Sequence, residues 1–214
     1  MAEWPTTVAE ARVVQESLRS QVICEDRFDK VERVAGADVG FEDGGNTTRA
    51  AVVVLNFPQL ELLDQVVVRQ PTRFPYVPGY LSFREAPAVI EAFRRLHHSP
   101  DLLVCDGQGI AHPRRFGLAC HLGVLLDLPT IGVAKSRLTG TYTEPGPKKG
   151  DWSELRDGEE CIGSVVRTRD NVKPVFVSCG HRVGNRSAVK LALACTGRYR
   201  LPETTRWAHR LASN

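Results

Sequence analysis

The residues best suited to chemistry lie in one mid-chain run, LLVCDGQGIAHPRR, at residues 102–115. An apolar, strand-like segment ends at Asp106, passes through a Gly-Gln-Gly turn and then presents the imidazole of His112 and two arginines. Strand ends that open onto glycine turns often carry chemistry in α/β proteins, because the backbone can approach a ligand closely there. A carboxylate beside concentrated positive charge indicates a metal-assisted reaction on a phosphate.

A second carboxylate, Asp38, interrupts an apolar strand-like segment at residues 34–41. Aspartate is unfavourable in strands, and burying its charge without a partner costs free energy. Asp38 could pair with an arginine or cap a turn. A metal explains it better if the strand that ends at Asp106 is its neighbour, because two adjacent aspartates repel each other unless a cation lies between them. Oxygen ligands favour Mg²⁺ or Mn²⁺ over zinc.

Glu85 is the third candidate carboxylate. Ser82 and Glu85 have the spacing of a capping box. Pro87 disfavours that helix start, because it would then lack a hydrogen bond inside the helix. A helix that begins near Ala86 makes Pro87 a favourable first-turn residue. We therefore predict a helix over about residues 86–97, with Glu85 at its entrance and free to face the two aspartates.

His112, Lys135 and His209 are the remaining candidate site residues. Lys135 follows the apolar segment 130–134, so it lies at the same sheet edge as Asp106 if the two strands are parallel. There it could hold a phosphate or steady a hydroxide. His209 lies in a basic helical segment, where a lone histidine is more often a surface or packing residue.

Tyr76 lies between Pro75 and Pro78, directly before the helix that carries Glu85. A stiff loop that exposes a ring can insert it into a stack of bases. The alternative is a rigid loop whose tyrosine packs on the core. A dinucleotide site is disfavoured, because His112 stands where the third glycine of the Rossmann pattern would be.

Length and composition indicate one soluble globular domain over residues 1–214. The chain has no apolar run of the roughly 20 residues that a membrane helix needs, and it begins without a secretory signal pattern. Its six cysteines include no C-x-x-C pair, which argues against a zinc knuckle and fits thiols in a cytosol. Residues 182–214 contain seven lysines and arginines and one acid. Such a segment suits a polyanion, although a solvated basic face is an equally good interpretation.

Hydrophobic periodicity predicts a mixed α/β domain. Short connections between the first three strands favour an antiparallel meander, and the later strand–helix–strand order favours parallel pairing. The predicted strands are 31–41, 49–57, 60–69, 102–106, 130–134 and a hairpin of 161–168 with 175–178, and 143–151 is an exposed loop. The predicted helices are 8–22, 86–97, 116–126, 187–195 and 203–211.

Five segments, in order along nearly the whole chain, resemble the endonuclease V family of deoxyinosine-specific repair nucleases. These segments are VAGADVGF at 34–41, FPYVPGYLSFRE at 74–85, DGQGIAHP at 106–113, PTIGVAKSR at 129–137 and PETTRWAH at 202–209. The resemblance implies a ribonuclease H-like fold, in which a mixed central sheet is flanked by helices. It also implies a DNA-repair enzyme that uses Mg²⁺, with Mn²⁺ able to substitute. We further expect a cytoplasmic protein that acts as a monomer.

The same resemblance assigns roles to individual residues. Asp38 and Asp106 match metal-binding aspartates, Glu85 matches a third active-site carboxylate, and His209 matches an active-site histidine. Lys135 and His112 match residues beside the scissile phosphate. The implied lesion-binding residues are Tyr76, as a wedge within Pro75, Val77 and Pro78, and Gly79, Leu81 and Gly107, whose backbone groups would form the pocket.

The implied reaction is hydrolysis of the second phosphodiester bond 3′ to deoxyinosine, which leaves 3′-hydroxyl and 5′-phosphate ends. His209 or Lys135 would assist the attacking water or the leaving oxygen. Two alternatives remain open at this point: an endoribonuclease acting on inosine in RNA, and a lesion-binding protein that does not cut.

Overall fold

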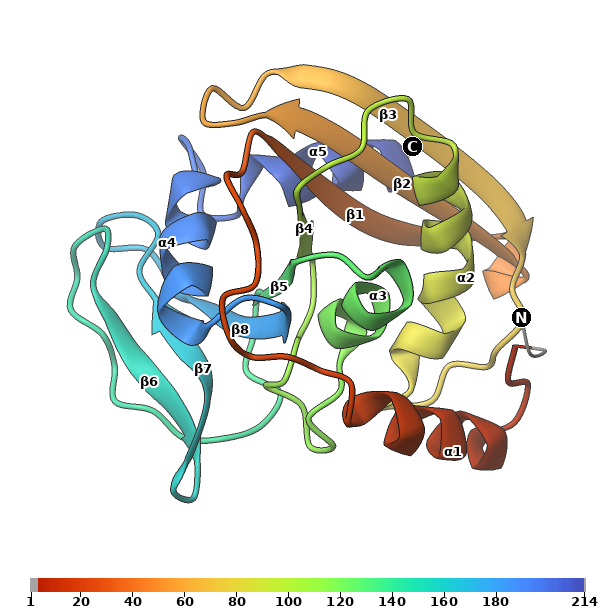
Figure 1. Ribbon diagram of the computed structural model, residues 1–214, viewed down its shortest axis with the longest axis horizontal. Coiled ribbons are helices and arrows are strands. Elements are labelled where there is room, and N and C mark those ends of the chain that lie inside the picture. The colour runs from red at the N-terminus through yellow and green to blue at the C-terminus, as the bar shows by residue number, and fades with distance from the viewer. Residues whose placement is uncertain (1–3, 214) are drawn as a thin grey trace.

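The computed structural model describes residues 4–213, which form one eight-stranded mixed sheet with helices on both faces (Figure 1). The strands are β1 (Arg33–Glu42), β2 (Thr47–Asn56), β3 (Leu62–Pro71), β4 (Leu102–Cys105), β5 (Thr130–Ala134), β6 (Trp152–Asp157), β7 (Glu160–Val166) and β8 (Val175–His181). The helices are α1 (Val8–Arg19), α2 (Leu81–Arg94), α3 (Leu118–Leu126), α4 (Asn185–Ala194) and α5 (Glu203–Ala212), with a 3₁₀ turn at Asp43–Gly45.

The strands lie in the order β3-β2-β1-β4-β5-β8-β7-β6. Strands β1, β2 and β3 pair antiparallel, β1, β4 and β5 pair parallel, and β8, β7 and β6 continue antiparallel. The predicted meander, the parallel pairing and the late hairpin are therefore confirmed. This is the mixed α/β, ribonuclease H-like architecture that the resemblance implied.

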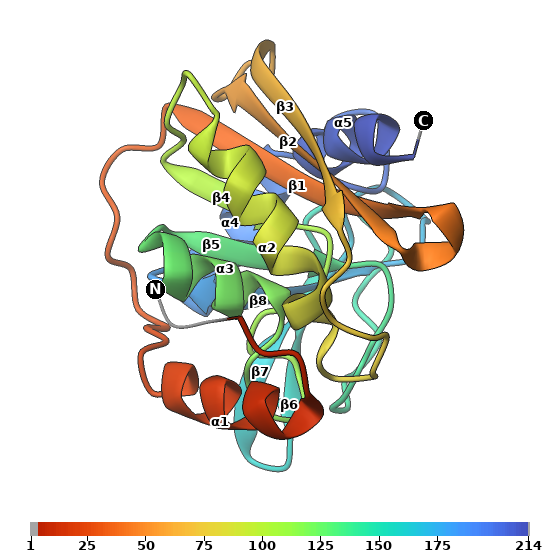
Figure 2. The same ribbon diagram turned by 90° about the vertical axis from the view of Figure 1, so that its right-hand side faces the viewer.

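The two faces of the sheet carry different helices (Figure 2). Successive side chains of a strand point to opposite faces, so Val34 packs in the core beneath α4 while Ala35 packs in the core beneath α2 and α3. Helix α5 lies across β1 and β2 on the α4 side. Within the described residues, no helix is both long and apolar enough to cross a membrane.

The predicted start of the second helix is wrong. Helix α2 begins at Leu81, and Pro87 lies inside it. A proline in a helix cannot donate to the carbonyl four residues earlier, here that of Phe83. The indole nitrogen of Trp4 donates to this oxygen at 2.8 Å instead. A tertiary hydrogen bond thus replaces the missing helical one, which lets the helix continue through the proline.

Strand β6 is a second difference, because the sequence analysis did not predict it. Only Leu155 among its six residues is buried, so the segment lacks the apolar alternation that identifies a strand. It forms at the sheet edge by pairing with β7. Other boundaries shift by a few residues: α1 ends at Arg19, α3 begins at Leu118 and α4 begins at Asn185. The stretch 143–151 contains no helix or strand, as predicted.

Candidate active site

Asp38 and Asp106 lie at the same end of two neighbouring strands. Strands β1 and β4 are parallel, and their last paired residues are Ala37 and Cys105. One residue farther along β1 is Asp38, and Asp106 directly follows β4. Burial raises the pKa of Asp38, a hydrogen bond from His209 opposes that rise, and the charge of Asp106 adds to it. The two carboxylates are therefore close enough for their negative charges to repel each other.

Glu85 is contributed by helix α2, and its carboxylate lies near enough to both aspartates for their charges to act on it. Burial is the main cause that raises the pKa of Glu85 to about 8, and the charges of Asp38 and Asp106 add to it. Among residues 4–213, no hydrogen bond or ion pair connects the Glu85 carboxylate to a cation. The charge of Arg84 opposes this rise in the pKa of Glu85 but does not cancel it.

Each aspartate has one basic side chain as its hydrogen-bonding partner. Lys135 Nζ lies 2.5 Å from Asp106 Oδ2, and His209 Nδ1 lies 2.7 Å from Asp38 Oδ2. Lys135 reaches Asp106 because β4 and β5 are parallel and it directly follows β5. His209 was expected from residue spacing to be a surface or packing residue; the fold places it against Asp38.

Two glycines of β1 allow His209 to reach this position. A Cβ atom on Gly36 would lie 2.2 Å from the carbonyl oxygen of Thr204, and one on Gly40 would lie 2.3 Å from that of Ala212. Helix α5 therefore packs directly on the strand backbone, closer than any side chain would permit. This close approach sets the distance between His209 and Asp38.

The donor set suits a hard divalent cation. Carboxylate oxygens are the ligands that Mg²⁺ and Mn²⁺ prefer. A cation bound among the three acids would favour the charged form of Glu85, which burial and the two aspartates disfavour. Within the described part of the chain, no three His, Cys, Asp or Glu side chains already stand in a coordinating arrangement. Lys135 provides a positive charge at Asp106, and His209 provides a hydrogen bond at Asp38. The residues therefore fit an oxygen-ligated ion by their chemistry and charge.

A cavity of about 390 Å³ adjoins Glu85, Asp106 and Lys135. Six of the predicted DNA- or lesion-binding residues line it, namely Tyr76, Pro78, Gly79, Leu81, Gly107 and His112. Pro75, Val77, Asp38 and His209 are not among the lining residues. The cavity is partly apolar, and Glu85 and Asp106 contribute polar groups to its lining, a combination typical of small-ligand sites.

The side chains of Tyr76 and His112 differ in exposure. Tyr76 is 68% exposed, so the alternative in which it packs on the core is wrong. His112 is buried, and burial, reinforced by the charge of Arg114, lowers its pKa to about 4. The imidazole of His112 is therefore neutral at pH 7 and acts there as a hydrogen-bonding group rather than a cation.

Gln108 is a cavity residue that the sequence analysis did not select. It lies within the Gly-Gln-Gly turn, and its amide nitrogen donates to the carbonyl of Ser136 at 3.0 Å across the cavity. The turn itself is held tightly, because a Cβ atom on Gly109 would lie 1.8 Å from the carbonyl oxygen of Cys179. One on Gly132 would lie 2.5 Å from the backbone nitrogen of Gly109. The position of Gln108 between two glycines was the available sequence signal.

Comparison with known proteins gives consistent matches over the whole chain. The family model described as endonuclease V matches residues 16–210. An endonuclease V of Nostoc sp. is 56% identical over 212 residues, which are 99% of this chain and 96% of that protein. The crystal structure of endonuclease V from Streptomyces avermitilis superposes with a TM-score of 0.94 at 48% identity, covering 99% of this chain and 94% of that one.

A further solved structure contains nucleic acid. It is endonuclease V of Ciona intestinalis, a D234N variant, in complex with a 23mer DNA that contains an inosine followed by a ribo-adenosine. It superposes with a TM-score of 0.85 at 31% identity, covering 96% of this chain and 95% of that one.

Proposed function

This chain belongs to the endonuclease V family, and from that premise we propose that it is a metal-dependent endonuclease that cuts DNA beside deoxyinosine. Hydrolysis would take place at the second phosphodiester bond 3′ to the lesion and leave 3′-hydroxyl and 5′-phosphate ends. The observation that carries this proposal is the convergence of Asp38, Glu85 and Asp106 beside a cavity large enough for a base.

The three carboxylates would hold Mg²⁺, or Mn²⁺ in its place, with Asp38 and Asp106 as the principal ligands. The bound ion would lower the pKa of a coordinated water and stabilise the charge that develops on the scissile phosphate. Glu85 would order that water or a second ion, because the charges of Asp38 and Asp106 both act on its carboxylate.

The cavity would take the everted hypoxanthine base. A base must leave the stack to enter such a pocket, and this costs less at a hypoxanthine mispair than at a normal pair. The exposed ring of Tyr76, held in the Pro75–Pro78 turn, would fill the space that the base leaves. Backbone groups of Gly79, Leu81 and Gly107 would then contact the base edge from the cavity wall.

Lys135 would neutralise charge on the phosphate, and His209 would transfer a proton near it. The Lys135 ammonium adjoins both the cavity and Asp106, so it can neutralise a phosphate oxygen placed there. The His209 ring, held by Asp38, has a second nitrogen that is free to exchange a proton with water or with the leaving oxygen. His112, neutral and buried in the cavity wall, accepts a hydrogen bond at Nδ1 from the Arg114 backbone at 3.1 Å and would hold the cavity wall beside the scissile phosphate.

Cleavage of inosine-containing RNA is the second candidate function. The Ciona complex is the observation that favours this second candidate, because the inosine in its DNA is followed by a ribonucleotide. The two substrates differ at the 2′-hydroxyl, which is the group that distinguishes RNA from DNA at a given position.

The test is a nicking assay on matched duplexes with one deoxyinosine, one inosine ribonucleotide or neither. We expect Mg²⁺-dependent nicking of the deoxyinosine strand that EDTA abolishes and that Asp38→Asn and Glu85→Gln lose. Asp29→Asn, at an exposed carboxylate elsewhere on the surface, should cut normally. Full cutting by Asp38→Asn would refute the proposed ligand, and binding without any nick would indicate a lesion-binding protein instead.

A further inference from the structure

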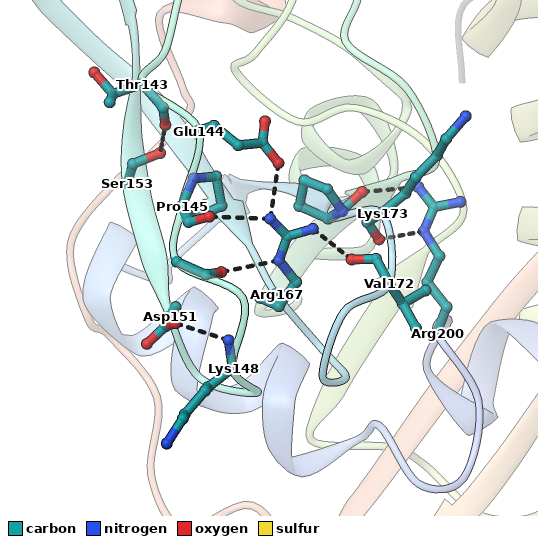
Figure 3. Close-up of polar contacts among 12 residues, drawn as sticks. Thr143, Glu144, Pro145, Lys148, Asp151, Ser153, Arg167, Val172, Lys173 and Arg200 are labelled. Atoms are coloured by element: carbon teal, nitrogen blue, oxygen red, sulfur yellow. Dashed lines mark hydrogen bonds and ion pairs between the residues drawn. The ribbon is translucent and has the colours of Figure 1, made fainter.

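Arg200, in the segment between α4 and α5, binds three backbone carbonyls. Its guanidinium donates to the carbonyl oxygens of Pro174 at 2.8 Å and Lys173 at 2.8 Å (Figure 3). It also donates to the carbonyl oxygen of Lys135 at 2.7 Å. Its own carbonyl accepts a hydrogen bond from the hydroxyl of Thr168 at 2.7 Å. In the described structure no carboxylate pairs with Arg200, so its donors serve the backbone alone and its charge is not neutralised by an acid.

The contact with Lys135 lies just beyond the end of the β5–β8 strand pairing. The last residue of β5 that pairs with β8 is Ala134, opposite Phe176. The carbonyl of Lys135 lies beyond that ladder, and Arg200 gives it a donor. Because the carbonyl direction fixes the orientation of the peptide plane, this hydrogen bond also restricts where the Lys135 side chain leaves the backbone.

We propose that Arg200 is a positioning residue for the cleavage reaction: by holding the backbone of Lys135, it keeps the ammonium group beside Asp106 and the cavity. This inference rests on the proposed function, in which Lys135 adjoins the scissile phosphate. A misplacement of about 1 Å in a group that contacts the reacting atoms can cost on the order of a hundredfold in rate. A shift of that size away from Asp106 would lengthen the 2.5 Å Lys135–Asp106 contact beyond the roughly 3.2 Å limit of a good hydrogen bond.

Arg167 provides a matched control, because it binds the same loop in the same way. It donates to the carbonyls of Val172 at 2.5 Å, Gly146 at 3.0 Å and Pro145 at 3.0 Å, and it pairs with Glu144 at 2.8 Å (Figure 3). The two arginines therefore both support the loop at 172–174. Only Arg200 extends this support to Lys135.

The experiment compares Arg200→Gln, Arg200→Lys and Arg167→Gln in single-turnover cleavage of a deoxyinosine duplex. We expect Arg200→Gln to lower the cleavage rate about tenfold or more, with the Kd for DNA nearly unchanged. Arg200→Lys should recover part of the rate, and Arg167→Gln should stay within about twofold of the parent protein. In a Lys135→Ala background, Arg200→Gln should cause no further loss, because residues that act through one another are not additive.

Two results would overturn the proposal. An equal loss from Arg200→Gln with and without Lys135 would show that Arg200 acts independently. A weaker Kd with a shallower salt dependence would show that Arg200 contacts a phosphate directly. If the parent protein does not cut, or Lys135→Ala cuts normally, the proposed function fails separately from this inference.

A second measurement does not depend on cleavage. Amide hydrogen exchange should increase in Arg200→Gln over residues 134–138 and 172–176, and in Arg167→Gln over 144–150 and 172–174 only. Unchanged exchange over 134–138 in folded Arg200→Gln protein would contradict the positioning role, whatever the activity. Thermal melting of each variant confirms that the comparison is made on folded protein.

Discussion

Gly36→Ala should disable the enzyme by moving helix α5. The added methyl group would lie 2.2 Å from the carbonyl oxygen of Thr204 and 2.3 Å from its carbonyl carbon. Ordinary contacts for a Cβ atom begin near 3.4 Å, so the helix must retreat by about 1 Å. The His209–Asp38 hydrogen bond is 2.7 Å long. A retreat of that size takes it beyond the roughly 3.2 Å limit of a good hydrogen bond.

Two quantities should therefore change together. Overpacking of this kind costs about 1–3 kcal/mol of unfolding free energy, which urea denaturation measures. Loss of a positioned proton-transfer group costs on the order of a hundredfold in rate or more, which single-turnover cleavage measures. His209→Ala should give a similar rate, and adding Gly36→Ala to it should lower the rate little further.

Gly123→Ala is the matched control for the loss of stability. Its methyl group would lie 2.3 Å from Thr130 Oγ1 and 2.5 Å from His181 Cβ, at the end of β5 remote from Lys135. It should lose a comparable amount of stability and keep its cleavage rate. Normal cleavage by folded Gly36→Ala would refute the reasoning that the closeness of α5 to β1 sets the position of His209.

Two further predictions concern stability. Trp4→Phe should lower the unfolding free energy by about 1 kcal/mol in urea denaturation, because the Phe83 carbonyl loses its donor. The loss should be smaller in a Pro87→Ala background, because an alanine at that position has an N–H that can donate to the same carbonyl. An equal loss in both backgrounds would contradict this. Burial lowers the pKa of His121 to about 3 from its ordinary 6.5. Between pH 6.5 and 3, His121 is therefore protonated in the unfolded chain but neutral in the folded one. Stability should therefore fall as the pH drops below 6.5, by about 2 kcal/mol from this residue at pH 5. His121→Asn should show a shallower fall between pH 7 and 5 in urea denaturation, and parallel curves would contradict it.

The sequence was sufficient to predict the strands that carry the site. Apolar alternation and short turns predicted the meander, and the strand–helix–strand order predicted that β4 and β5 are parallel. Those two predictions together bring Asp38, Asp106 and Lys135 to one edge of the sheet. Local pattern decides such placements, because strand direction and period fix where a residue at a strand end must lie.

What the sequence did not predict depends on contacts between distant segments. The start of α2 was misplaced because the rule for proline in helices is local, whereas Trp4 compensates for Pro87 from 83 residues away in the chain. Strand β6 exists because β7 offers it an edge. The position of His209 depends on how closely α5 can approach Gly36 and Gly40, which no periodicity shows.

The glycines around the Gly-Gln-Gly turn determine which wall of the cavity can move. Gly109 lies against the backbone of β8 and Gly132 lies against Gly109, with no side chain between them that could change rotamer. This floor can shift only if two central strands shift with it. Adjustment of the cavity to bases of different size must therefore come from the opposite wall, where Tyr76 and Leu81 are exposed and free to rearrange.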